Sequence, residues 1–158
     1  MNRPDSKPQA AGWPQYRAIV VHGRGQAEDA LRLGVPVTLL SAVAAARLGG
    51  ASWWRGLVAA ARAAHPATPC VDILDCADAA GLAMAALRLG QRHLVLWPES
   101  PAFSAVHAAA NAMGLVVIAA RPPALDLSER GAHRRLSEYL CPKIASGPPD
   151  RDSATLLR

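Results

Sequence analysis

The sequence predicts an α/β fold with an open, mostly parallel five-stranded sheet and helices on both faces. Three times, at Gly34, Gly90 and Gly114, an apolar helical segment ends in glycine and a strand-like segment follows. Glycine commonly ends helices because it adopts the left-handed conformation without strain. The strand-like segments are short, mostly apolar runs without regular alternation, which are typical of parallel strands buried on both sides. A half-barrel-like βα repeat is the alternative architecture.

Predicted strands and helices alternate along the chain. The strands are expected at residues 18–21, 37–40, 71–74, 93–96 and 115–119. The helices are expected at residues 26–33, 43–48, 52–64, 78–89 and 101–113, with Ser52 and Asp78 as caps. Five βα units are too few for an eight-stranded barrel, which takes about 250 residues, so an open sheet is favoured.

The chain divides into four predicted segments. Residues 1–16 lack periodicity and contain three prolines, so they are expected to form a flexible arm before the α/β domain of residues 17–126. Residues 127–142 are expected to form an amphipathic helix, and residues 143–158 a disordered tail. One face of that helix is apolar, at Ala132, Leu136, Tyr139 and Leu140. This face packs either on its own domain or on a second copy, which raises the hypothesis of an assembly protein that forms a homodimer.

Composition limits the classes of partner. The chain has 158 residues, of which 51% are hydrophobic, as expected for a single globular domain. Only two of its 17 basic residues are lysine, and the stretch from Ala18 to Asp126 holds eight arginines against seven acids. A nucleic-acid surface needs clustered cations. Nucleic acid is therefore not expected as a partner.

The cysteines and the N-terminus bear on location. Cys70, Cys76 and Cys141 show no CxxC spacing, and their odd number argues against a disulfide framework. This pattern favours a reducing compartment. The N-terminal residues lack the apolar segment of a secretory signal, and no apolar run approaches the roughly 18 residues of a membrane span. A cytoplasmic protein without membrane contact is expected.

The candidate binding residues lie in loops at one edge of the predicted sheet. In open parallel sheets, ligands bind beyond the carboxyl ends of the strands. The loops there supply the candidate ligand-binding residues Gly23, Arg24, Gly25, Ser41, Ser100 and Arg121. The two glycines permit a tight turn, and the helix after them directs free N–H groups outward. A module that binds a small anionic ligand is therefore the first functional hypothesis, with Arg24 and Arg121 as charge partners.

No cofactor is identified by this loop. The third glycine of a dinucleotide-binding fingerprint would fall at residue 28, which is Glu28. The lysine of a phosphate-binding P-loop does not follow either, and no spacing of His, Cys, Asp and Glu matches a metal site. The cofactor therefore stays unknown.

Four further residues at this edge are candidate catalytic residues, namely His22, Asp75, Cys76 and Glu99. Asp75 could act as a base, and Cys76 would lie near a helix N-terminus, where thiolates are stabilised. His22 could pair with Asp75 or Cys76 if the first and third strands are neighbours. A lyase or hydrolase is thus an alternative function. Each residue also has a structural interpretation, with Asp75 bonding loop amides and Cys76 acting as a small buried apolar side chain.

Overall fold

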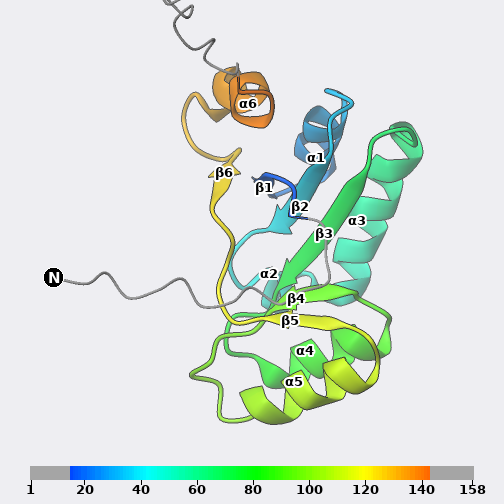
Figure 1. The fold of residues 1–158 in the computed structure, drawn as a ribbon, viewed down its shortest axis with the longest axis vertical. Helices are drawn as coiled ribbons and strands as arrows, with labels where there is room; N and C mark the ends of the chain where they lie inside the picture. The colour runs from blue at the N-terminus through cyan, green and yellow to red at the C-terminus, as the bar shows by residue number, and fades with distance from the viewer. Residues whose placement is uncertain (1–14, 143–158) are drawn as a thin grey trace, which may run out of the picture.

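The computed structural model describes residues 15–142, in which six parallel strands form one sheet (Figure 1). The strands are β1 (Ala18–Val21), β2 (Val37–Ser41), β3 (Cys70–Asp75), β4 (His93–Val95), β5 (Val116–Ile118) and β6 (Ala124–Asp126). Their order across the sheet is β5-β4-β3-β2-β1-β6, and every pairing is parallel. The five predicted strands are confirmed. The sixth, β6, was not predicted, because its residues Ala-Leu-Asp do not form an apolar run.

Helices follow the first four strands and β6 in sequence. They are α1 (Arg24–Leu31), α2 (Ala45–Leu48), α3 (Gly50–Ala64), α4 (Ala80–Arg88), α5 (Phe103–Ala112) and α6 (Ala132–Leu140). The glycines expected to end three of these segments all have positive φ, at +71° for Gly34, +79° for Gly90 and +67° for Gly114. The left-handed conformation required there explains why glycine recurs.

All six helices pack against the same face of the sheet. From β1 to β5, each new strand is added on the same side of the strand before it, so the sheet grows in one direction. Right-handed crossovers between parallel strands added in this way place every connecting helix on one face of the sheet. Buried residues of all six helices share one core with strand residues such as Ile19, Leu39 and Leu74. The expectation of helices on both faces is therefore wrong. It assumed a doubly wound sheet, in which the strand order reverses.

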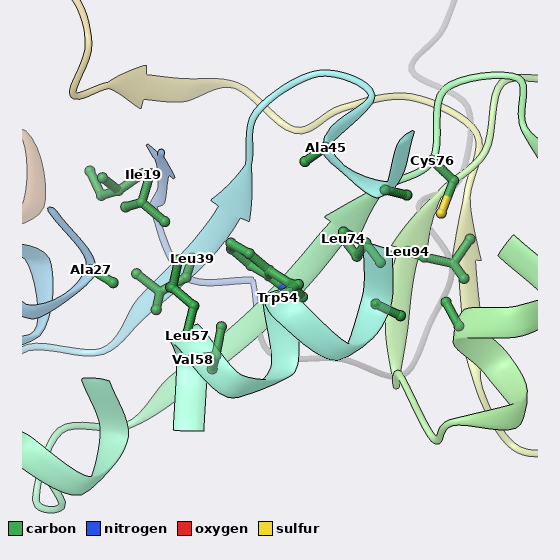
Figure 2. Close-up of a cluster of buried hydrophobic side chains, with 14 of the residues drawn as sticks. Ile19, Ala27, Leu39, Ala45, Trp54, Leu57, Val58, Leu74, Cys76 and Leu94 are labelled. Atoms are coloured by element: carbon green, nitrogen blue, oxygen red, sulfur yellow. The ribbon is translucent and has the colours of Figure 1, made fainter. Parts of the chain in front are cut away.

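Trp54 from α3 is at the centre of the helix-side core (Figure 2). Its side chain is fully buried and lies near Leu39 and Leu74 from the sheet. The opposite face of the sheet has its own small cluster, formed by Val20, Leu40, Ile73 and Val95. The alternation of side chains along each strand separates these two clusters.

The connection between β5 and β6 joins opposite edges of the sheet. Residues 119–123 carry the chain back past β4, β3, β2 and β1 before β6 pairs with β1. Figure 1 shows this segment, in yellow, on the side of the sheet away from α3. Its return in the reverse direction explains why it lies opposite the helices.

The C-terminal helix α6 is present and packs on its own domain. Ala132, Leu136 and Leu140 of the predicted apolar face are buried in the helix-side core. A guanidinium nitrogen of Arg17 donates a hydrogen bond of 2.9 Å to the Tyr139 carbonyl, and the guanidinium lies 5.4 Å from the centre of the tyrosine ring. The apolar face of α6 is therefore buried against its own chain.

The helix starts differ from the predicted caps. The residues that precede α3 and α4 are Gly49 and Ala79 rather than Ser52 and Asp78, and neither helix has a side-chain cap.

Within the described residues, no helix is long and apolar enough to cross a membrane. Most of the predicted flexible arm, and the whole predicted tail at 143–158, lie outside the described part of the chain.

Candidate functional site

Six of the predicted site residues form two separate groups at the carboxyl edge of the sheet. Ser41, Asp75 and Arg121 are joined in a largely buried cluster. His22, Gly23 and Arg24 line a surface pocket. The two groups have different chemistry.

The buried cluster is built around the carboxylate of Asp75, which is fully buried. Its Oδ1 accepts hydrogen bonds from the backbone N–H groups of Ala44 at 2.9 Å and Ala77 at 2.8 Å, and its Oδ2 pairs with Arg121. Arg121 also donates to the Ser41 carbonyl at 3.0 Å, while the Asp75 N–H donates to the Ser41 hydroxyl at 2.8 Å. Both charges are thus neutralised within the cluster, which fastens the segment 119–123 to β2 and β3.

Two strained alanines flank this carboxylate. Ala44 has φ of +56° and Ala77 has φ of +51°. The left-handed conformation costs about 1–2 kcal/mol for a residue with a Cβ atom. The backbone N–H groups of Ala44 and Ala77 both donate to Asp75, so this buried carboxylate stabilises the two turns in which these alanines lie. The sequence carried no signal for them, since alanine is not a turn residue.

Cys76 is fully buried next to this cluster. Burial, together with the charge of Asp75, raises the pKa of its thiol to about 12. The thiol therefore stays protonated at neutral pH and is a poor nucleophile. This environment matches the structural interpretation of Cys76.

Iodoacetamide is expected to alkylate Cys76 far more slowly than Cys141 in the native protein. The reaction needs an accessible thiolate, and Cys76 is buried with a raised pKa whereas Cys141 is exposed. Peptide mass spectrometry after timed labelling near neutral pH measures both rates, and labelling in urea gives the unfolded reference. Rapid selective modification of native Cys76 would contradict this assignment.

Within the described chain, the side chains of Glu99 and Ser100 form no hydrogen bond or ion pair with the other candidates. Glu99 is exposed in the turn after β4, and no hydrogen bond or ion pair joins it to Asp75 or His22 in the described residues. Ser100 is buried, and its hydroxyl has no hydrogen-bond partner among residues 15–142. Asp78, from the same edge, pairs with Arg47 of α2.

His22 pairs with a residue that the sequence did not single out. Because β2 separates β1 from β3, the condition for pairing with Asp75 or Cys76 is not met. Its Nε2 instead lies 2.8 Å from Oδ1 of Asp126 in β6. Asp126 also accepts hydrogen bonds from the N–H of Ser128 at 2.8 Å and from its hydroxyl at 2.7 Å. Without a predicted β6, nothing in the sequence pointed to this pair.

The pKa of Asp126 is lowered overall. Partial burial acts to raise it, but the hydrogen bonds from Ser128 and His22 outweigh that effect. The carboxylate is therefore ionised at neutral pH and orients the His22 ring.

The surface pocket lies between the start of α1 and α3 and has a volume of about 480 Å³. His22, Gly23 and Arg24 form one wall, and Ser52 and Trp53 of α3 lie on the other. Gly25 is exposed in the first turn of α1, outside this lining. No side chain caps α1, whose preceding residue is Gly23. The first N–H groups of a helix have no partners within it, so this end of α1 is a potential anion site.

Neither similarity to known proteins nor a cluster of metal-binding side chains identifies a known site in the described residues. Within residues 15–142, no group of three or more His, Cys, Asp or Glu side chains could hold a metal ion. No protein-family model and no curated protein matches the chain. The chemistry of the candidate site therefore follows from its own side chains.

Proposed function

We propose that the protein is a binding module for a small anionic molecule, held in the pocket between α1 and α3. The observation that carries this proposal is the uncapped start of α1, which lies beside a pocket lined by His22 and Arg24. Helix N-termini stabilise anions through free N–H groups and the positive end of the helix dipole.

Arg24 is available to the ligand although it has a partner. Its side chain is 63% exposed, and its Nε lies 2.5 Å from Oε1 of Glu28. An exposed ion pair contributes little to stability, so exchange of Glu28 for a bound anion costs little. The guanidinium then contacts the same anionic group as the helix N-terminus.

The opposite wall suits an apolar or planar part of the ligand. Trp53 is 42% exposed and lies in the pocket with Leu57 and Ala60. Aromatic faces bind planar groups well, because stacking adds to the free energy of burial. The pairing of Asp75 with Arg121, and the buried thiol of Cys76 with its raised pKa, favour binding over the lyase or hydrolase alternative.

Phenyl phosphate is the probe that tests this pocket, with phenol as its uncharged match. We expect phenyl phosphate to shift the indole N–H signal of Trp53 in NMR spectra and to bind more tightly than phenol. Arg24→Gln should weaken binding by about tenfold, because a hydrogen bond to a charged group is lost.

Arg47→Gln is the matched control for this titration. Arg47 is also exposed and ion-paired, but it does not line the pocket. Its substitution should leave the affinity for phenyl phosphate unchanged. Binding that Arg24→Gln does not weaken, or no Trp53 shift with either probe, would refute the proposed function.

A further inference from the structure

A second cavity lies at the opposite, amino-terminal edge of the sheet. Its volume is about 560 Å³, and it is bounded by α3, the start of β3 and the turn between α4 and β4. Three arginines line it, namely Arg55 and Arg62 from α3 and Arg92 from the turn. Asp72 is the one carboxylate in this lining, so its formal net charge is +2 with His93 neutral.

The carboxylate of Asp72 is fully engaged by neighbouring donors. Its Oδ2 accepts from the indole Nε1 of Trp54 at 3.1 Å and from Nε2 of Gln91 at 2.8 Å. Its Oδ1 accepts from Arg62 at 2.8 Å, and Arg62 also donates to the Cys70 carbonyl at 3.0 Å. Arg62 is thereby held in place at the cavity wall.

The other two arginines have no acidic partner. Among residues 15–142, no ion pair involves Arg55 or Arg92. Nη1 of Arg55 would lie 3.5 Å from a Cβ atom on Gly90, so the Arg55 side chain reaches over the turn that carries Arg92. Two uncommitted guanidinium groups therefore approach the same cavity from different elements.

The titratable groups around these arginines add no negative charge. Burial lowers the pKa of His93, although nearby Asp72 acts to raise it, so the ring is neutral at pH 7. Burial raises the pKa of the Cys70 thiol to about 11, which keeps it protonated. The cavity is therefore positive throughout the neutral range.

We propose that this cavity binds the phosphate group of a small phosphorylated molecule, at a site separate from the pocket beside α1. Guanidinium groups bind phosphate through paired, charge-assisted hydrogen bonds, and Arg55 and Arg92 have donors to spare. The volume falls within the range of about 300–1,000 Å³ that is usual for small-molecule sites, which leaves room for a polar body beside Gln91 and His93.

Ribose 5-phosphate, inorganic phosphate and ribose are the probes, titrated at constant ionic strength with the full chain. We expect ribose 5-phosphate and phosphate to bind and ribose not to bind. The indole N–H signal of Trp54 should shift, since that group donates to Asp72 in the cavity wall. Arg55→Gln and Arg92→Gln should each weaken binding by about tenfold, because each removes charge-assisted hydrogen bonds. Both residues are exposed, so these variants should fold normally.

Two control variants make the outcome specific. Arg88→Gln and Arg47→Gln each remove an exposed arginine that lines neither this cavity nor the pocket beside α1. Neither should change the affinity for ribose 5-phosphate or the shift of Trp54. Absence of binding, binding that survives Arg55→Gln and Arg92→Gln, or an equal loss in Arg88→Gln would each overturn the proposal. Because the Trp54 signal reports on this cavity and the Trp53 signal on the pocket beside α1, failure here leaves the proposed function testable by its own probe.

Discussion

Arg121→Met is expected to lower the free energy of unfolding by about 3–5 kcal/mol. The substitution leaves the fully buried carboxylate of Asp75 without its counter-charge. An uncompensated buried charge is far more costly than a lost surface pair. The hydrogen bond to the Ser41 carbonyl is lost as well, which releases the segment 119–123 from β2. Urea unfolding followed by circular dichroism measures the change.

Arg47→Met is the control for this experiment. Arg47 also pairs with an aspartate at the same edge of the sheet, but the side chains of Arg47 and Asp78 are 51% and 52% exposed. An exposed pair contributes about 0–1 kcal/mol, so this variant should unfold at nearly the wild-type urea concentration. Similar losses in the two variants would show that Arg121 is not the structural link described here.

Trp54→Ala is expected to destabilise the protein by about 3–5 kcal/mol. Trp54 is the largest fully buried side chain, and its removal opens a cavity in the helix-side core (Figure 2). It also deprives Asp72 of a hydrogen-bond donor. Thermal and urea unfolding give the change in stability.

The adjacent Trp53 provides the matched comparison. Its side chain is 42% exposed, so Trp53→Ala should change the free energy of unfolding by only about 0.5 kcal/mol. Both variants remove the same atoms from neighbouring positions of one helix. A loss of equal size in the two variants would contradict the difference in burial on which this prediction rests.

The local elements were predictable from the sequence because their causes are local. Short, mostly apolar runs identified five of the six strands, and positive φ at Gly34, Gly90 and Gly114 confirms the helix ends. The face covered by the helices was not predictable in this way. It depends on strand order, and strand order depends on pairings between segments that are distant in the sequence.

The candidate site residues show the same difference between what local sequence predicts and what only folding brings together. The position of His22, Gly23 and Arg24 at a strand end followed from the apolar run before them, and these residues do line a pocket. The cavity at the amino-terminal edge had no sequence signal, since Arg55, Arg62 and Arg92 are scattered along the chain. Only folding brings their side chains to one concavity.

By itself, the sequence determined that this chain forms buried parallel strands joined by glycine-ended helices, and which loops meet at the carboxyl edge. The tertiary structure decided which charges neutralise each other there. Asp75 and Arg121 are 46 residues apart, and His22 and Asp126 are 104 apart. The physical reason is that an ion pair or hydrogen bond acts over a few ångströms, so its partner is set by strand order and burial rather than by neighbouring residues.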